Sequence, residues 1–460
     1  MILLRKGSYL ILFGCVLVGL LDGAAHAPGQ TPAPNAANDA AVAQPAMITL
    51  DEAIHRAQSS DANYAAAVAA GQSAALERRN AYGDLLPNVV YHNQGLYTQS
   101  NGLTNQAGQG VNSQPAPRFI ANNAVREYAS QATVNEALGL AGIAAVRRAR
   151  AQAAQAAAEQ EIARRGLVAA VVSLFYGVVA ADRKLTIAER AQQEAAEFTK
   201  LTAEREQARE SAHADVIKAQ LEEQARNRDV QDARVQAEKA RLELGVLLFP
   251  DPRTAYLLSA PDAPPALASR EDVDAAAAKN NPELRSALES LRVSNAGVTA
   301  AWASYLPDIG LNYTYGIDAP QFAVNGPDHV RNLGYSAMVT VDIPVWDWFN
   351  TERRVKQSQI ARQSAQVALS ATERQLIARL DEAYVEAATA RDELASLDLS
   401  VQTAAESLRL SKMAYTGGEA TVLEVVDAQN AYLAAQNARE DGRVRYAAAR
   451  ANLQTLTGTM

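Results

Sequence analysis

Residues 302–317 read WASYLPDIGLNYTYGI, and residues 82–97 read YGDLLPNVVYHNQGLY. Each segment follows helix-forming sequence, places an aromatic residue before a Leu-Pro pair, and continues as a strand-like pattern. Proline has no backbone N–H with which to continue a helix, so Leu86-Pro87 and Leu306-Pro307 mark two entries from helix into strand. Few residues are identical between the copies. The order of the elements therefore predicts a duplicated module and a pseudo-symmetric protein.

The composition favours long helices over a thick globular core. The 460 residues are 48% apolar and only 6% aromatic, and alanine supplies much of the apolar content. Alanine is the best helix former and lets neighbouring helices approach closely. The formal net charge of −8 leaves no basic patch for phosphate backbones, which argues against nucleic acid as a partner.

The first 25 residues have the pattern of an export signal peptide. Arg5-Lys6 make a basic start, residues 8–21 are apolar, and Gly23-Ala24-Ala25 form a small-residue cleavage site. We expect cleavage after Ala25, because cleavage after Ala27 would place Pro28 beside the cut. Residues 26–46 then form a loose linker rich in alanine and proline.

Cys15, the single cysteine of the sequence, has two interpretations. Residues 12–15 loosely resemble a lipoprotein signal, which would attach lipid to this thiol. Alternatively the cysteine is discarded with the signal, because residues 16–21 stay apolar where a mature lipoprotein turns polar. The mature chain then holds no thiol, which suits an oxidising compartment. Since no other apolar run reaches about 18 residues, we expect any membrane insertion to use strands.

Proline placement divides the rest of the chain. Five prolines lie between residues 250 and 265, and they mark a linker at residues 249–269 between the two copies. Two long proline-free tracts, residues 118–249 and 345–460, consist mostly of helix formers. We therefore expect a first repeat at residues 47–248 and a second repeat at residues 270–460.

The second tract has the spacing of a coiled coil. Apolar or small residues follow one another at steps of four and three: Leu376, Leu380, Ala383, Ala387, Ala390, Leu394, Leu397, Val401, Ala404, Leu408, Ser411 and Tyr415. The pattern resumes after Gly417-Gly418 and runs from Val425 to Leu456, with lapses at Arg439 and Gly442. This spacing predicts a helical hairpin at residues 350–457 with a glycine turn at its tip. A first arm of about 65 residues would span roughly 100 Å.

The first tract aligns with the second without a gap. Residues 215–220 (DVIKAQ) fall on residues 424–429 (EVVDAQ), and Leu244 falls on Leu453. The tract predicts a second helical hairpin at residues 138–248, whose tip lacks glycine. Chance similarity between two alanine-rich segments is the competing explanation.

Strands are expected after each Leu-Pro pair. Residues 308–318 and 332–345 alternate between apolar and small or polar residues, while strands at about 88–100 and 119–136 are less clear. Residues 101–118 are rich in glycine, asparagine and glutamine and indicate an exposed loop. A buried hairpin in a sandwich would show the same alternation. Strands of about ten residues with tyrosines along one face are also typical of outer-membrane barrels.

The twice-repeated order of helix, Leu-Pro strand, loop, strand and helical hairpin resembles the TolC family of outer-membrane efflux ducts. The tip sequence YTGGEATVLEVVDAQ at residues 415–429 and the Asp342-Ile343-Pro344 ending of the last strand carry the resemblance together with that order. It covers nearly everything from Ile48 to Gly458. The fold it implies is mainly α with a membrane β-barrel portion: two structural repeats, long antiparallel coiled-coil hairpins forming a periplasmic α-barrel, and four strands per protomer in a shared trimeric β-barrel.

The resemblance also implies partners and site residues. Such a duct is a homotrimer in outer-membrane lipid, and its periplasmic tips meet an adaptor protein and, directly or indirectly, an inner-membrane transporter. A ring of acidic residues past the second tip constricts the channel, and Glu424 and Asp427 occupy those positions. The family's closed state uses residues that map to Tyr415 and Asp215. An arginine that some members place in the second tip is Ala420 here, so the resemblance does not imply the closed-state contact of that arginine for this chain.

Each assignment has a structural alternative. Glu424 and Asp427 also fit a solvated helix face, Tyr415 fits the helical seam, and Asp215 fits a favourable charge at a helix N-terminus. Gly417 and Gly418 serve the turn itself, and adaptor contact is an added role.

Other functional classes find less support in the sequence. The five histidines have no metal-ligand spacing, and there is no phosphate loop or nucleophile elbow, so we expect neither catalytic residues, nor a metal, nor a cofactor. A periplasmic adaptor would carry one hairpin between small β domains, and an adhesin-like coiled coil would lack paired strands. The exported substrate is not encoded in any motif of this chain.

Overall fold

A computed structural model describes residues 46–97, 126–259, 266–326 and 330–459. The expected signal peptide, Cys15, nearly all of the first linker and the loop at residues 101–118 lie outside these ranges. The elements in chain order are β1 (Ala46–Thr49), α1 (Leu50–Ser60), α2 (Ala62–Gly83), β2 (Asn88–Tyr97), β3 (Arg126–Leu138), α3 (Leu140–Gln207), α4 (His213–Leu248), β4 (Tyr256–Ser259), α5 (Arg270–Asn280), α6 (Pro282–Ala303), β5 (Asp308–Ala319), β6 (Leu333–Asp342), α7 (Asn350–Gly417) and α8 (Val422–Thr457).

The helices have the same lengths in the two halves of the chain. Helices α1 and α5 have 11 residues, α2 and α6 have 22, α3 and α7 have 68, and α4 and α8 have 36. Similar caps begin α2 and α6. The Asp61 side chain accepts a hydrogen bond from Tyr64 N (2.6 Å), and the Asn281 side chain accepts one from Leu284 N (2.9 Å). Both satisfy backbone donors that a helix N-terminus leaves free.

Each Leu-Pro pair lies between a helix and a strand. Leu86 N donates to Gly83 O and Leu306 N donates to Ala303 O, both at 2.9 Å, so the two helices end in the same turn. The prolines that follow cannot extend the helix, and β2 and β5 begin one residue later. All four residues of the two pairs are exposed. The strand β3 reaches Leu138, two residues beyond the expected end at 136, and β6 ends at Asp342 rather than 345, because Pro344 follows.

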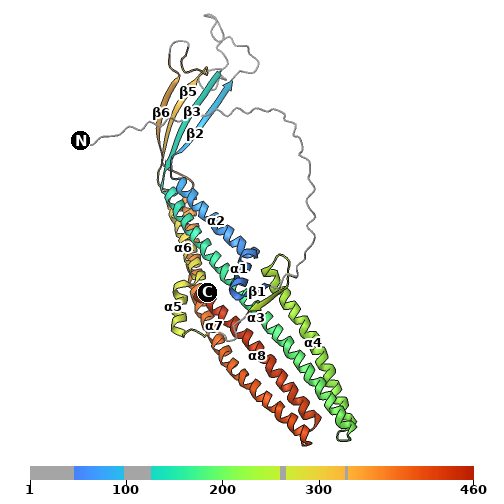
Figure 1. The fold of residues 1–460 in the computed structure, drawn as a ribbon. Helices are drawn as coiled ribbons and strands as arrows, with labels where there is room; N and C mark the ends of the chain where they lie inside the picture. Colours follow the sequence, from blue (N-terminus) through green and yellow to red (C-terminus); the bar gives the residue numbers. More distant parts are fainter. Residues whose placement is uncertain (1–45, 98–125, 260–265, 327–329, 460) are drawn as a thin grey trace, which may run out of the picture. The chain divides into compact units, whose positions relative to one another are not determined.

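The four long strands form one antiparallel sheet in the order β2-β3-β5-β6 (Figure 1). On one face, Tyr313 pairs with Val134 and Ala337, and Tyr315 pairs with Ala132 and Tyr335. The opposite face carries polar or small residues such as Asn312 and Thr314. Along β5 the apolar residues at 309, 311, 313 and 315 are the exposed ones, whereas their small or polar neighbours are half-buried.

A short parallel pair, β1 with β4, was not expected from the sequence. It brings the start of the first repeat onto the segment between the repeats, with Ala46 opposite Tyr256 and Thr49 opposite Ser259. Ile48 and Tyr256 are buried in the main apolar cluster together with Phe175 and Val171 of α3. Four-residue strands are too short to show the period-two pattern on which strand prediction depends.

Helix α3 is the central element of the helical region and contacts α1, α2, α4, α6 and α8. Among the described residues it is also the one helix with an 18-residue window apolar enough, by length and composition, to cross a membrane. The expectation that no such run follows the signal peptide was therefore too strong. The apolar side chains of α3 that carry this character, including Leu167, Val171, Phe175 and Val178, form the main core cluster.

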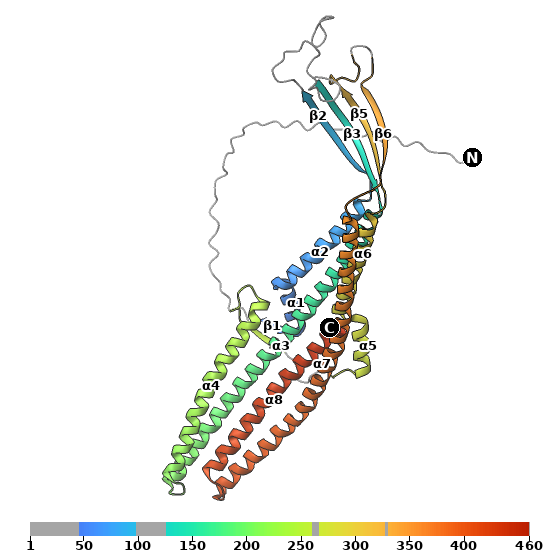
Figure 2. The same ribbon diagram turned by 180° about the vertical axis from the view of Figure 1, so that it is seen from behind.

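The predicted seam of α7 matches the burial of its side chains. Leu376, Leu380, Ala387, Ala390, Leu394, Leu408 and Tyr415 are buried, and the other five seam residues are half-buried. Helix α8 packs along the second half of α7, and α4 packs in the same way along the second half of α3. The two pairs meet through α3 and α8 (Figures 1 and 2).

The two lapses in the α8 seam have separate causes. A Cβ atom at Gly442 would lie 2.5 Å from Leu397 Cδ1, so glycine there permits the close approach of α7 and α8. Arg439 belongs to a charged cluster around Glu440, whose side chain is 1% exposed. Arg183 of α3, Arg439 and Arg443 donate to the Glu440 carboxylate over 3.3, 2.9 and 3.4 Å. This buried charge is thus paired, and it links α3 to α8.

Candidate functional site

The ends of both helix pairs lie together, at the end of the helical region away from the sheet (Figure 2). They share one apolar cluster: Phe198 of α3, Ala219 of α4, Tyr415 of α7, and Val422 and Val425 of α8. We call the turn after α3 (residues 208–212) the first tip and the turn after α7 (residues 418–421) the second tip. Of the residues singled out from the sequence, this region holds Tyr415, Gly417, Gly418, Glu424, Asp427 and Asp215.

Both tips end their first helix with the same hydrogen-bond pattern. At the second tip, Gly418 N donates to Tyr415 O (3.1 Å) and Glu419 N donates to Ala414 O (2.8 Å). At the first tip, Arg209 N donates to Glu206 O and Glu210 N donates to Arg205 O, both at 2.8 Å. This is the Schellman motif, which needs one residue with positive φ. Gly418 supplies it with φ 82°, and Arg209 supplies it with φ 59°.

The two glycines of the second tip therefore have different roles. Gly418 holds a left-handed conformation that strains any residue with a Cβ. Gly417 is the last residue of α7, and a Cβ at that position would meet open space. The turn needs glycine at 418 but not at 417.

Tyr415 is buried (5% exposed) and packs against α3. Its ring lies edge-on to Phe198, with centroids 5.1 Å apart, and its hydroxyl donates to Thr202 Oγ1 over 3.4 Å. The Arg205 guanidinium lies 4.9 Å from the centre of the same ring and donates to the Tyr415 carbonyl. Sequence reasoning found Tyr415 but missed Arg205, because no periodicity or motif marks a single charged residue in a helix end that also carries several glutamates.

Glu424 and Asp427 lie exposed on the first turns of α8. Thr421 caps this helix: its hydroxyl oxygen accepts from Glu424 N (3.3 Å), and the hydroxyl donates to Glu424 Oε1 (3.1 Å). The cap fixes the Glu424 carboxylate near the positive end of the helix. Asp427 follows at i+3, on the same helix face.

Asp215 lies near the start of α4 and does not contact Tyr415 in this structure. Its carboxylate pairs with Lys218 Nζ over 3.4 Å, within α4. In the gapless alignment of the two hairpins, Asp215 corresponds to Glu424, Lys218 to Asp427, and Ala212 to the capping residue Thr421. Ala212 provides no side-chain cap.

A small cavity of about 110 Å³ lies among α3, α4, α7 and α8 above the tips. Gln429, the last residue of the VVDAQ sequence, lines it, and both polar atoms of its buried amide lack a protein partner among the described residues. Arg226 also lines the cavity and bonds Glu222 (2.8 Å) on α4 and Asn430 (2.8 Å) on α8. A buried amide without a partner costs about 1–3 kcal/mol, and a polar cavity of this volume has room for water that would bond the Gln429 amide.

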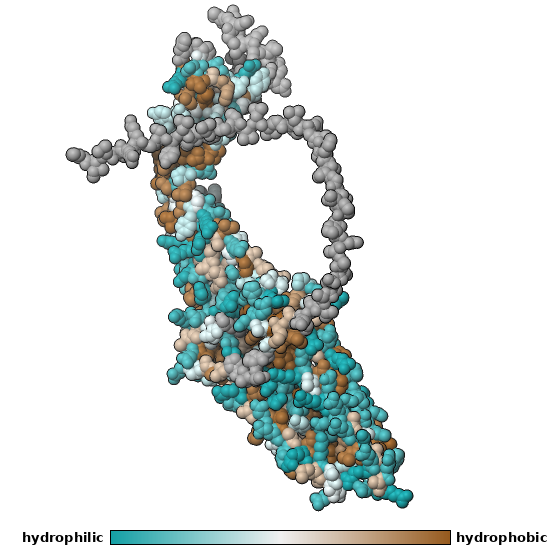
Figure 3. Space-filling view, viewed as in Figure 1, coloured by the Kyte–Doolittle hydropathy of each residue, from teal (hydrophilic) through white to brown (hydrophobic). Residues whose placement is uncertain are grey.

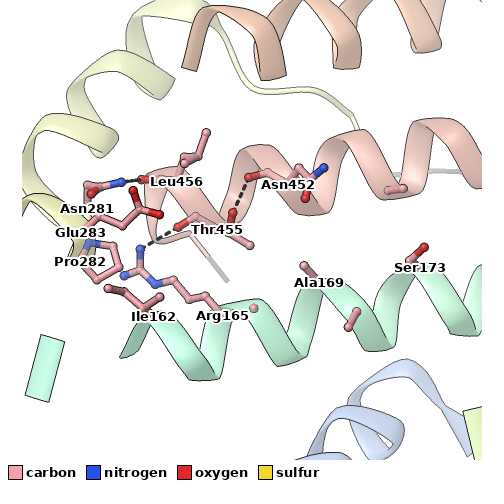
Figure 4. A pocket seen from close by; sticks show the side chains of 13 residues that line it. Ile162, Arg165, Ala169, Ser173, Asn281, Pro282, Glu283, Asn452, Thr455 and Leu456 are labelled. Carbon is pink, nitrogen blue, oxygen red and sulfur yellow. Dashed lines mark hydrogen bonds between the residues drawn. The ribbon is translucent and has the colours of Figure 1, made fainter. Parts of the chain in front are cut away.

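The opposite end of α8 is fixed to α3 by Arg165 (Figure 4). This buried guanidinium bonds Glu161 (2.7 Å) and donates to the backbone carbonyls of Thr455 on α8 (3.0 Å) and Asn280 on α5 (3.2 Å). The neighbouring Asn281 amide donates to Leu456 O over 3.2 Å. Hydrogen bonds, chiefly from Arg164 and also from Arg165, lower the pKa of Glu161 to about 2. A cavity of about 440 Å³ beside Arg165 lies between α3, α6 and α8.

Within the described ranges, no group of three or more His, Cys, Asp or Glu side chains is arranged to hold a metal ion. The arrangement at the tips is one of helix ends, packing and exposed carboxylates. Its chemistry is that of electrostatic selection and of contacts that hold helices together.

Comparison with known proteins finds similarity in the second half of the chain. Residues 275–459 match the family model of the outer membrane efflux proteins. The outer membrane protein OprJ of Pseudomonas aeruginosa is 24% identical over 164 residues, which are 36% of this chain and 34% of OprJ. The matched segment therefore spans about a third of that relative.

The solved structures show that the fold extends over most of the chain. A membrane protein from Pseudomonas aeruginosa superposes with a TM-score of 0.74 at 19% identity, over 89% of this chain and 90% of that one. The CmeC outer membrane channel of Campylobacter jejuni gives a TM-score of 0.71 at 17% identity, over 89% of this chain and 85% of CmeC. This mainly helical fold with one four-stranded antiparallel sheet is the fold of outer-membrane channels of the TolC type.

Proposed function

We propose that this chain, whose residues 275–459 match the family model of the outer membrane efflux proteins, is the outer-membrane duct of an efflux or secretion system. Three copies form one channel, with the strands in the outer membrane and the helices in the periplasm. The duct receives small molecules or secreted substrates from an inner-membrane pump through a periplasmic adaptor. It is gated at the helix tips.

The observation that carries the proposal is the inverted polarity of the sheet. The exposed face of β5 and β6 is apolar and includes Leu311, Tyr313, Tyr335, Val339 and Val341. Figure 3 shows hydrophobic residues over the sheet and its junction with the helices. A sandwich would bury this face, whereas a membrane barrel presents it to lipid and keeps polar residues inside. The strands of 10 to 13 residues are long enough to cross a bilayer.

The homotrimer accounts for the open edges of both regions. β2 and β6 are edge strands, and edge strands with unpaired backbone groups are not tolerated in hydrocarbon, so the sheet must close with other copies. The outer helices also leave apolar side chains exposed. They are Ile217, Leu221, Val235 and Val246 on α4, and Ile360, Val367, Ile377, Val385, Leu399 and Leu410 on α7. Helices α4 and α7 of neighbouring copies would cover each other and complete a ring.

Glu424 and Asp427 are the proposed constriction. Threefold symmetry would place six carboxylates around the axis, and such a ring attracts cations and retards anions. The Thr421 cap supports this role because it holds Glu424 at a defined position. Asp215 in the first turn of α4 is the proposed partner of Tyr415 in gating, and the exposed Gly417 and Gly418 are the proposed contact of the adaptor.

The alternatives from other classes fit the arrangement less well. A periplasmic adaptor would not expose the apolar face of a sheet, and a structural coiled coil would not contain paired strands that begin after Leu-Pro junctions. The direct test is the state of the protein in cells. Trimers in the outer-membrane fraction that dissociate on heating support the duct, and a monomer that is soluble after signal removal contradicts it.

Two adjacent residues of β6 make this test specific for the orientation of the sheet. Val339 lies on the exposed apolar face and Met338 on the opposite face. Arginine on the lipid face of a barrel costs about 2–4 kcal/mol at mid-membrane, so Val339→Arg should strongly reduce the amount of heat-modifiable trimer. Met338→Arg should leave trimer formation largely intact. Equal loss in both variants would count against a lipid-facing surface.

A further inference from the structure

The side chain of Arg205 connects the ends of two helices that belong to different halves of the chain. Arg205 lies in the last turn of α3 and is 18% exposed. Its Nη1 donates to the backbone carbonyl of Tyr415 in the last turn of α7, and its guanidinium lies over the Tyr415 ring at 4.9 Å. The same group forms an ion pair with Glu210 of the first tip over 3.4 Å.

Both partners of this contact belong to the capping motifs of the tips. The Arg205 carbonyl accepts the Glu210 N–H that closes the first tip, and the Tyr415 carbonyl accepts the Gly418 N–H that closes the second. A guanidinium between two helix C-termini is also favoured by the negative ends of both helix dipoles. One side chain therefore acts on the ends of both long helices at once.

The other polar contacts that link the two hairpins near the tips are weaker or more distant from the turns. The Tyr415 hydroxyl reaches Thr202 at 3.4 Å, which is long for a bond between hydroxyl groups. Lys412 pairs with Glu194 at 2.9 Å one turn further from the tip, and both side chains are over a third exposed. Asp215 bonds Lys218 within its own helix. Ala414, which corresponds to Arg205 in the other hairpin, offers no reciprocal contact.

We propose that Arg205 is the positioning residue that holds the second tip against the first and so keeps Glu424 and Asp427 at the constriction. This inference rests on the proposed function as a channel gated at its tips. When the Arg205 contact breaks, the ends of α7 and α8 move away from α3, and the backbone bonds that close each turn remain. Arg205 does not line the constriction itself and acts through Tyr415.

The first test is hydrogen exchange in the intact trimer in lipid nanodiscs. Arg205→Ala should raise exchange about tenfold in the last turn of α7 and the first turn of α8, which corresponds to about 1.4 kcal/mol. Exchange in the last turn of α3 should change little, because the Arg205 guanidinium donates to a backbone carbonyl of α7 and to none of α3. Arg205→Gln should behave like Arg205→Ala, and Arg205→Lys should lie between these variants and the parent, because lysine keeps the charge but lacks the planar guanidinium.

Lys200 provides the matched control. It is an exposed cation on α3, slightly more than one turn before Arg205. Lys200→Ala removes the same charge from the same helix and should leave exchange at the second tip unchanged. If Arg205→Ala and Lys200→Ala gave the same exchange pattern as the parent, Arg205 would not hold the tip.

Single-channel recording separates this inference from the proposed function. If the parent conducts and Arg205→Ala raises the open probability about tenfold, the result supports both the channel function and the role of Arg205. A parent that conducts while Arg205→Ala and Arg205→Gln match it in open probability contradicts the role of Arg205 and leaves the channel intact. A folded trimer without conductance, in parent and variants alike, contradicts the proposed function, and the exchange experiment still decides whether Arg205 pins the tip.

Discussion

The two tips share their backbone hydrogen bonds but differ in the residues that stabilise them. At the second tip, Gly418 takes the left-handed position, Thr421 caps the next helix, and Tyr415 anchors the end of α7 in an apolar cluster. At the first tip the corresponding residues are Arg209, Ala212 and Glu206. Arginine tolerates positive φ poorly, and alanine caps nothing.

This difference indicates that the two hairpins stabilise their tips in different ways. The second tip precedes the paired carboxylates of α8. Its turn, its helix cap and its apolar packing each depend on one particular residue. The first tip is held mainly by backbone bonds and by the Arg205 and Glu210 pair. We therefore expect substitutions at corresponding positions to have unequal effects, and the largest difference to be at the anchor.

Tyr415 and Glu206 are the pair with the largest expected difference. Tyr415→Ala removes a buried ring and leaves a cavity, so we expect it to destabilise the second tip locally by about 3 kcal/mol. Glu206 is partly exposed and bonds the exposed His213, so Glu206→Ala should change the first tip by less than about 0.5 kcal/mol. Hydrogen exchange of the tip amides measures both. Equal effects would show that Tyr415 is not an anchor.

The left-handed positions give the next pair. Gly418→Ala should destabilise the second tip by about 1 kcal/mol, and Arg209→Gly should stabilise the first tip by a similar amount, because only glycine adopts positive φ without strain. Gly417→Ala should be neutral or slightly stabilising, because that residue is helical and its Cβ meets open space. The same exchange experiment measures all three. A destabilising Gly417→Ala would contradict the assignment of the turn.

The helix caps give a smaller effect of opposite sign at the two tips. Thr421→Ala removes the side-chain acceptor for Glu424 N and should destabilise the start of α8 by about 1 kcal/mol. Ala212→Thr introduces the missing cap at the start of α4 and should stabilise it by up to about 1 kcal/mol. Thermal unfolding of isolated peptides is not suited to these helices, so local exchange in the trimer is again the measurement. If Ala212→Thr had no effect, the missing cap would not be what limits the stability of the first tip.

The smallest effect on the tips is expected from a substitution in the middle of α3, which serves as a control. The pKa of Glu161 is lowered to about 2 in the folded protein from an ordinary value of 4.5. A lowered carboxyl pKa contributes stability that is complete above about pH 4.5 and is lost as the pH falls towards 2. Glu161→Gln should therefore flatten the acid dependence of exchange around Arg165 between pH 4.5 and 2. Exchange at both tips should keep the parental profile at each pH.

The parts of the fold that depend on local chemistry could be predicted from the sequence. The residues of the α7 seam from Leu376 to Tyr415 follow the burial pattern because helix periodicity alone decides which face packs. The Leu-Pro pairs lie at helix ends because proline cannot extend a helix. The resemblance to the TolC family is confirmed by the family match and by the fold.

Features that depend on contacts between distant residues were missed. Gly442 interrupts the seam pattern because Leu397 of another helix occupies the space its side chain would need. Glu440 is buried because three arginines from two helices surround it. β1 and β4 pair across some 200 residues of sequence, and Arg205 meets Tyr415 from the opposite hairpin. None of these contacts leaves a periodic signal in the sequence.

The central claim is that Glu424 and Asp427 form the selective constriction of a channel. Single-channel recording of the purified trimer in planar bilayers, with the parent beside the Glu424→Ala, Asp427→Ala double variant, tests it most directly. We predict a cation-selective parent blocked by divalent cations, and a double variant that has lost most of its selectivity and block. Unchanged cation selectivity and divalent block in the double variant would contradict the claim.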